Sequence, residues 1–282
     1  MTADMFRAPM RSRNRIWPLA AAAALSLLAL SACAKKAPAV KYESPAEEDY
    51  VLGVAELEDR NFPDAQKILE KVRTKYPYSK YGVQAELRLA DLRYDQGKFI
   101  EAADAYQTFV KIHPSSPEVD YAAFRAALSR WNDAPSDFFL FPSVHERDLT
   151  QVAKAADGLA LFVEKYPASK YAPEAKEKLA KIRDILAERD WYAFEFYKKR
   201  EKWQGAAFRL ERLTKDYPGS TREPEALWQL AGMYMKLSER YRAQQALQQL
   251  IVKFPESKQR ASAEKLLAEL RIQPEPAASP WK

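Results

Sequence analysis

The sequence has few of the residues on which catalysis, metal binding and covalent cross-linking depend. Its 282 residues include one cysteine, two histidines and seven glycines. A single cysteine leaves no partner for an intramolecular disulfide. So few glycines count against an all-β fold, which needs many tight turns, and against a glycine-lined phosphate loop. We therefore expect a helical body that holds no cofactor.

The two histidines do not form a ligand set. His113 lies in the aromatic position of a repeated motif described below, and we interpret it as a ring that packs in a turn rather than as a ligand. His145 stands beside Glu146, Arg147 and Asp148, but a metal site normally needs three or four ligands. No nucleophile-elbow, P-loop, zinc-protease or dinucleotide motif is present. The sequence thus predicts no metal site, no catalytic residues and no enzyme.

A strong excess of charge of one sign is also missing. The formal charge of +6 includes five charged residues that precede Cys33, namely Asp4, Arg7, Arg11, Arg13 and Arg15. Without them the chain carries 41 basic and 38 acidic residues. This excess is small and evenly spread, and no basic run is interleaved with aromatic residues. We expect no nucleic-acid partner.

The amino terminus has the pattern of a lipoprotein signal peptide. Four arginines precede an apolar run, Ile16–Leu30, whose 15 residues are fewer than the roughly 20 of a transmembrane helix. The run closes with Leu30-Ser31-Ala32-Cys33, which resembles the lipobox of bacterial lipoproteins. A lone cysteine is otherwise most often a buried, inert thiol. We predict that residues 1–32 form the signal peptide and that Cys33 is lipidated.

The lipobox resemblance implies acyl chains on Cys33, which would hold the chain on a membrane. Ala34 follows the cysteine, and by the enterobacterial sorting rule this favours the periplasmic face of the outer membrane. Residues 33–45 are rich in alanine, lysine and proline without apolar periodicity, so we predict a flexible tether. Residues 273–282 contain three prolines, and we expect a disordered tail there.

A motif of aromatic residue or histidine, proline, any residue and serine occurs five times. Its prolines are Pro77, Pro114, Pro167, Pro218 and Pro255. Twelve residues before each proline stands an alanine: Ala65, Ala102, Ala155, Ala206 and Ala243. Eight residues before stand Leu69, Tyr106, Leu159, Leu210 and Leu247, and five residues before stand Val72, Phe109, Phe162, Leu213 and Leu250. Offsets of four and three residues lie on one face of a helix, so each set predicts a buried stripe.

The proline ends each predicted helix, and the serine two residues later is a good N-cap for the next one. This pattern of helix, turn, helix and stop resembles the tetratricopeptide repeat. We predict an all-α fold, a superhelical array of five such repeats over residues 46–272. The prolines are 37, 53, 51 and 37 residues apart, so the third and fourth repeats carry extra residues.

The extra residues are predicted in two places. In the third repeat an insertion runs from Trp131 to Asp148, and its apolar segment Phe138–Phe141 either fills a groove of the array or contacts a partner. In the fourth repeat the first helix is predicted to run from Pro173 to Arg200. We expect this long helix to divide the array into a three-repeat and a two-repeat half.

Together these features resemble the BamD family of outer-membrane assembly lipoproteins. Pro114 and Pro117–Ala122 resemble one segment of the family, with Ser116 in place of a histidine. Glu146–Asp148 resembles the end of the family's insertion. Leu186–Glu188, Ala193, Phe196, Tyr197, Arg200, Trp203 and Arg209 resemble its fourth repeat, with Asp190 as a departure. The resemblance covers residues 45 to about 257.

The resemblance implies a non-catalytic scaffold of the β-barrel assembly machine. Such a scaffold docks on the POTRA region of a BamA-like barrel-inserting subunit, joins other assembly-machine lipoproteins and assists the folding and insertion of unfolded outer-membrane proteins. It points to Arg200, Trp203 and Arg209 as partner-binding residues. For the substrate groove we select Tyr50, Arg93 and Tyr94. The alternative is a tetratricopeptide lipoprotein adaptor for pilus assembly or for cell-wall and division coordination.

Overall fold

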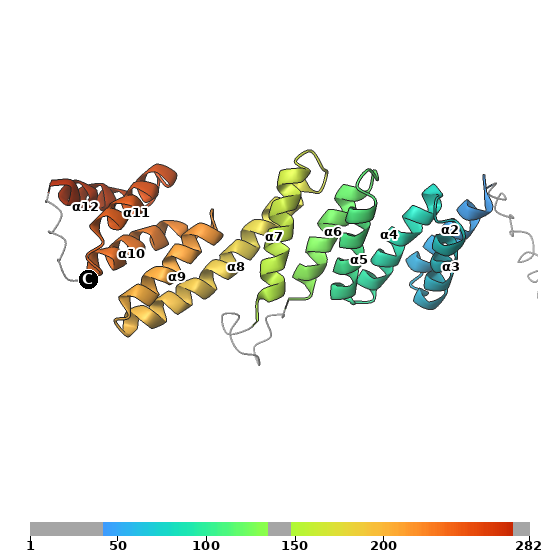
Figure 1. Ribbon diagram of the computed structural model, residues 1–282, viewed down its shortest axis with the longest axis horizontal. Coiled ribbons are helices and arrows are strands. Elements are labelled where there is room, and N and C mark those ends of the chain that lie inside the picture. The colour runs from blue at the N-terminus through green and yellow to red at the C-terminus, as the bar shows by residue number, and fades with distance from the viewer. Residues whose placement is uncertain (1–41, 135–147, 273–282) are drawn as a thin grey trace, which may run out of the picture. The chain divides into compact units, whose positions relative to one another are not determined.

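The computed structural model describes residues 42–134 and 148–272, which form eleven helices and no strand. The helices follow one another along the array in chain order (Figure 1). Each packs mainly against its neighbours in sequence. Their bounds are α2 Pro45–Glu58, α3 Phe62–Lys75, α4 Lys80–Asp95, α5 Phe99–Ile112, α6 Val119–Asn132, α7 Thr150–Lys165, α8 Ala172–Lys199, α9 Trp203–Asp216, α10 Glu223–Lys236, α11 Arg240–Lys253 and α12 Arg260–Ile272.

Consecutive helices pair into five repeats, each with a first helix A and a second helix B. The pairs are α2–α3, α4–α5, α6–α7, α8–α9 and α10–α11. The all-α repeat fold predicted from the sequence is therefore confirmed. Helix α12 follows the fifth pair and packs on α11 through Ala263, Leu267 and Leu270. It is an additional A-type helix without a B partner in the described residues, and the only part of the repeat motif that pointed to it was Ser257, the serine predicted to cap a following helix.

The predicted buried stripe of the B helices is confirmed in every repeat. The five alanines Ala65, Ala102, Ala155, Ala206 and Ala243 are all 0% exposed. The residues four and seven positions later are exposed by no more than 2%. Since alanine adds little bulk, it lets the B helix approach the neighbouring helices closely at this point.

The prediction that each motif serine caps the next helix is wrong for four of the five repeats. Ser79 does cap α4, where its Oγ accepts from the Gly82 amide at 3.0 Å. The next three A helices instead begin five residues after the proline, with Glu118, Tyr171 and Arg222 at their N-caps. An extra turn separates the serine from the helix, and within that turn the Oγ atoms of Ser116 and Ser169 accept hydrogen bonds from backbone amides. Ser257 does the same.

The turn between helices A and B places one residue in the left-handed region. This residue is Arg60, Gly97, Glu201 or Ser238 in repeats 1, 2, 4 and 5, with φ between 55° and 75°. It lies two residues before the first residue of helix B in each case. Of these four turns, only that of repeat 2 uses glycine, for which this conformation carries no steric penalty.

The predicted division of the array at the long helix is wrong. Helix α8 does run unbroken from Ala172 to Lys199, as expected. However, its buried residues belong to one apolar cluster that extends from Phe124 in α6 to Leu270 in α12. Smaller separate clusters fill repeats 1 and 2. One face of α8 is buried from Ala172 to Phe194 and packs on both α7 and α9, so α8 joins the repeats on either side of it.

Some predictions fall outside the described residues. These are the signal peptide, lipidation at Cys33, the tether up to residue 41, the segment Phe138–Phe141, His145 and the tail. Within residues 42–134 and 148–272, no helix is both long enough and apolar enough to cross a membrane. The same residues hold no group of three histidine, cysteine or acidic side chains placed to bind a metal.

Candidate binding surfaces

A polar network lies on the A helices of repeats 1 to 3 and on α5, and it is centred on Asp91 of α4. This carboxylate is only 5% exposed. Its Oδ1 accepts from the hydroxyls of Tyr106 at 2.5 Å and Tyr121 at 2.7 Å, and its Oδ2 accepts from Arg88 at 2.5 Å. Three donors from α4, α5 and α6 thus compensate one buried charge, as burial of a carboxylate requires.

Arg125 of α6 extends this network toward the surface. Its Nε donates to the Tyr106 hydroxyl at 3.2 Å, and its guanidinium lies over the ring of Tyr94 at 3.7 Å from the centroid. The Tyr94 hydroxyl in turn accepts from Asn132. A stacked guanidinium that is partly buried is held in one orientation, which lowers the entropy lost when it binds a ligand.

The tyrosines of the network stay protonated. Burial and the negative charge of Asp91 raise the pKa of Tyr106 and of Tyr121 above the usual value. Burial also raises the pKa of Tyr50 and of Tyr94, against the opposing effect of a nearby arginine, Arg88 and Arg125 respectively. The surface therefore offers hydroxyl donors, guanidinium groups and ring faces. Such groups can bind peptide carbonyls and carboxylates.

An open cleft of about 510 Å³ adjoins the network. Arg88 and Tyr121 contribute to its lining, and the rest comes from the start of α6 and the turn before α8. Ser169 of that turn donates to Asp120 at 2.7 Å, and Tyr171 stacks on Phe124 at 5.2 Å. The cleft thus brings together the middle of α4, the start of α6 and the turn before α8, and its lining carries both signs of charge.

The structure brings together two of the three residues selected for the substrate groove. Tyr50 lies beside Arg88 and packs on Tyr81 at 5.5 Å, and Tyr94 lies under Arg125. Arg93 instead donates to the carbonyl of Leu89 in its own helix and stays partly exposed. Its role in a groove remains a prediction.

Sequence reasoning missed four members of the network, namely Arg88, Asp91, Tyr121 and Arg125. One signal was available. Arg88 and Arg125 both stand eleven residues after a repeat proline, and repeat 4 has Lys178 there. Aligning the A helices, as well as the B helices, would have identified a basic column on one face.

A second surface lies at the hairpin between α8 and α9. The Arg200 guanidinium stacks on Phe196 at 3.5 Å and donates to the carbonyl of that residue at 3.2 Å. Phe196 is 47% exposed, and Tyr192, one turn earlier, is 48% exposed. Aromatic residues and arginine are enriched among the hot spots of protein interfaces, the few residues that contribute most of the binding energy.

The other two predicted partner-binding residues are less accessible. Trp203 is half-buried against the main apolar cluster. Arg209 forms an ion pair with Asp190 at 3.3 Å. Asp190 is fully buried and also pairs with Arg212, whose Nε donates to it at 2.8 Å. Arg209 therefore joins α9 to α8, and a contact of Trp203 or Arg209 with a partner remains a prediction.

His113 lies at the end of α5 and packs there as a ring. Its centroid is 4.9 Å from that of Phe109, and its Nε2 lies 2.8 Å from a carboxylate oxygen of Glu86. Because Glu86 belongs to α4, this contact ties the two helices of repeat 2 together.

Comparisons with known proteins agree with the resemblance noted in the sequence. Residues 42–249 match the model of the YfiO family, described as outer membrane lipoprotein. The chain is 29% identical to outer membrane protein assembly factor BamD of Neisseria gonorrhoeae over 237 residues, which cover 82% of this chain and 89% of that protein. It is 25% identical to the Caulobacter vibrioides protein of the same name over 264 residues, covering 93% and 83%.

Solved structures with similar folds include a thermophilic tetratricopeptide protein of Thermus thermophilus. It has a TM-score of 0.33 and 14% identity, with 81% of this chain and 100% of that chain covered. The TPR2AB domain of yeast Sti1 has a TM-score of 0.37 and 14% identity, covering 79% and 84%. The family match spans most of the described residues and both candidate surfaces. The chain belongs to the YfiO family of outer membrane lipoproteins, which is the BamD family.

Proposed function

We propose that this chain is a non-catalytic scaffold that assists the assembly of β-barrel proteins in the outer membrane. Its family membership and its similarity to relatives named as assembly factors support this role. The described residues offer two separate polar and aromatic surfaces suited to binding other chains. Repeat arrays suit such a role because stacking presents an extended surface with little internal motion.

The α8–α9 hairpin is the proposed docking surface for the POTRA region of a BamA-like subunit. The observation that carries this proposal is the exposed stack of Arg200 on Phe196. Trp203 would support the stack from the first turn of α9, and Arg209 would hold α9 against α8. Other assembly-machine lipoproteins are proposed as further partners of the array.

The network of repeats 1 to 3 is the proposed site for unfolded outer-membrane proteins. Tyr50, Tyr94 and the adjoining guanidinium groups supply donors for the backbone carbonyls and carboxylates of an extended segment. Arg93 would contact the segment from the exposed side of α4. Lipidation at Cys33 would hold both surfaces at the periplasmic face of the outer membrane, because acyl chains keep an attached domain at the membrane surface.

Charge reversal at the hairpin tests the docking proposal. Arg200→Glu should reduce co-purification with the barrel-inserting subunit from solubilised envelope by about tenfold or more, since removal of an interface hot spot costs about 2 kcal/mol or more. The matched control is Arg60→Glu, which changes charge equally at the exposed α2–α3 hairpin. Undiminished co-purification of Arg200→Glu would refute the docking site. Pilus or division proteins in the eluate, in place of a barrel subunit, would favour the alternative function.

A further inference from the structure

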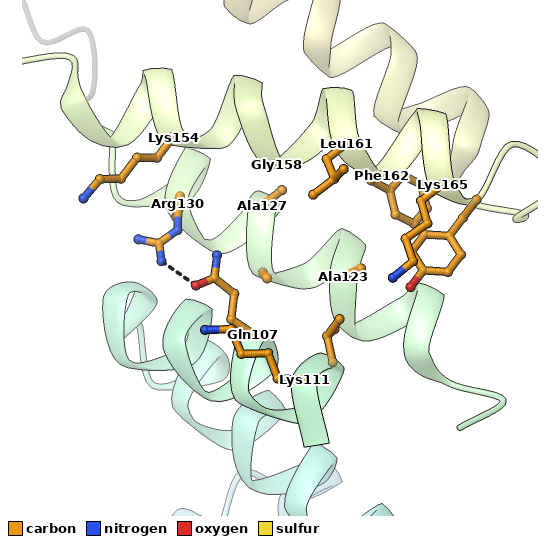
Figure 2. Close-up of a pocket in the computed structure, with 13 residues that line it drawn as sticks. Gln107, Lys111, Ala123, Ala127, Arg130, Lys154, Gly158, Leu161, Phe162 and Lys165 are labelled. Carbon is orange, nitrogen blue, oxygen red and sulfur yellow. Dashed lines mark hydrogen bonds between the residues drawn. The ribbon is translucent and has the colours of Figure 1, made fainter. Parts of the chain in front are cut away.

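A second hollow lies elsewhere on the array, between the B helices of repeats 2 and 3. It measures about 370 Å³, which falls in the range of about 300–1,000 Å³ typical of ligand sites. Figure 2 shows α5 and α7 on its two sides, with α6 behind it. The floor is made by Ala123, Ala126, Ala127, Gly158 and Phe162. We call this hollow the α5–α7 groove.

The groove exists because repeat 3 has small residues where other repeats have large ones. Ala126 stands twelve residues after its repeat proline, and the same position holds buried Leu89 in repeat 2 and Leu230 in repeat 5. Gly158 faces Ala127, and a Cβ added to it would lie 3.0 Å from the Ala127 Cβ. The missing leucine leaves an apolar space above a tight contact between α6 and α7.

The rim of the groove carries charge of one sign. Lys111, Arg130, Lys154 and Lys165 line it, and none of the described residues that line it is acidic. Arg130 is held in place by Asp104 at 3.0 Å and by Gln107 at 3.2 Å. The exposed Leu161 adds an apolar edge, with 61% of its surface accessible. A ligand that fits must therefore combine an apolar group with negative charge.

The distance between the lysines of the rim distinguishes a single anionic headgroup from an extended acidic peptide. Lys154 and Lys165 lie at opposite ends of the groove (Figure 2). They are eleven residues apart on one helix, which corresponds to about 16 Å. A single headgroup concentrates its charge at one end of the groove. Carboxylates five residues apart on an extended peptide span about 16 Å and can reach both lysines.

We propose that the α5–α7 groove binds an acidic peptide segment of a protein partner, with apolar side chains on the floor and flanking carboxylates on Lys154 and Lys165. Neither lysine belongs to the docking hairpin or to the network of repeats 1 to 3. Binding in the groove therefore requires neither Arg200 nor Tyr94, and the site is independent of the two surfaces proposed above.

A labelled octapeptide with a leucine–phenylalanine pair between two acidic triplets tests the proposal by fluorescence anisotropy with the full chain. We expect saturable binding that Lys154→Glu/Lys165→Glu weakens by about tenfold, since two lost charge contacts of about 0.7 kcal/mol each amount to one decade. The control Lys67→Glu/Lys215→Glu carries the same charge change on exposed lysines of α3 and α9 and should bind as the wild type does. A peptide with two serines in place of the apolar pair should bind more weakly.

Three results would overturn the proposal. The first is an absence of saturable binding up to about 1 mM peptide, which corresponds to about −4 kcal/mol. The second is equal binding of the peptide by the charge-reversed variant and by the wild type. The third is flotation with phosphatidylglycerol vesicles that depends on the two lysines, without any peptide binding. The last would assign the groove to a lipid headgroup. Both lysines are exposed, so circular dichroism should show that the variant remains folded.

Discussion

Single residues adopt the left-handed backbone conformation in the repeat turns, and a substitution of Gly97 measures what that conformation costs. It has a φ of +75°, and no atom lies within 4 Å of the place where a Cβ would be added. Alanine there meets no neighbour, so its cost is the left-handed backbone alone, about 1 kcal/mol. We predict that Gly97→Ala lowers the free energy of unfolding by this amount in a urea titration.

Gly232 provides the matched control. It lies within α10, has no neighbour within 4 Å of an added Cβ and does not adopt a left-handed φ. Gly232→Ala should therefore raise the free energy of unfolding by about 0.5–1 kcal/mol. Effects of the same sign at both positions would show that the backbone argument is wrong.

The raised pKa of Tyr106 predicts how stability responds to alkaline pH. Burial holds the proton on this hydroxyl in the folded chain, whereas the unfolded chain releases it near its ordinary pKa of 10.0. The stabilisation is complete below pH 10 and is lost as pH rises from there toward the folded pKa, because the unfolded state then binds fewer protons. In Tyr106→Phe the free energy of unfolding should therefore fall less steeply with pH than in the wild type, by up to about 1.4 kcal/mol per pH unit.

This pH effect is measured by urea unfolding between pH 9 and about 11. Tyr78→Phe is the control, because Tyr78 is fully exposed. This variant should show the same dependence of the free energy of unfolding on pH as the wild type. The same slope in Tyr106→Phe and in the wild type would contradict the assigned cause.

At the scale of elements, Asp190 tests how α8 and α9 are held together. It is 0% exposed, and Arg209 and Arg212 of α9 both donate to it. Asp190→Ala leaves two partly buried guanidinium groups without their carboxylate, so we predict a loss of about 3–5 kcal/mol in the free energy of unfolding.

The exposed pair of Arg222 and Glu188 serves as the comparison for Asp190. Its side chains are 38% and 35% exposed, so solvent screens the pair, and Arg222→Ala should cost less than about 1 kcal/mol. The measurement is thermal or urea unfolding of both variants. Comparable losses in both would mean that burial does not set the strength of the Asp190 pair.

The elements differ in how well the sequence predicts them. Helix B was predictable because its contacts repeat at fixed offsets within one element, as with Ala65 and Leu69. The Asp91 network was not, since Tyr106 and Tyr121 lie 15 and 30 residues away and their pairing depends on how three helices pack. The serine caps failed because a motif fixes the residue type but not the length of the turn that follows it. Helix α12 lies beyond the last motif, so Ser257 is the only repeat signal that precedes it, and no buried stripe marks the helix itself.

At the scale of the whole described array, the separate apolar clusters predict that stability is local. Removal of residues 260–282 takes away Ala263, Leu267 and Leu270, which cover α11. It also removes the Leu270 carbonyl, which accepts from Arg240 and Gln244 at 3.2 Å each. A repeat array behaves as a chain of nearest-neighbour contacts, so damage at one end should fade along it.

Hydrogen exchange of the truncated chain measures this decay. We expect amide protection to fall most in α11, less in α10 and α9, and not at all in α4 and α5, whose buried residues lie in clusters separate from the main one. The conservative variant Leu267→Ala should show the same gradient at smaller amplitude, because it leaves a cavity but keeps the helix. A uniform loss of protection from α4 to α11 would show instead that the array unfolds as one cooperative unit, with α8 coupling its ends.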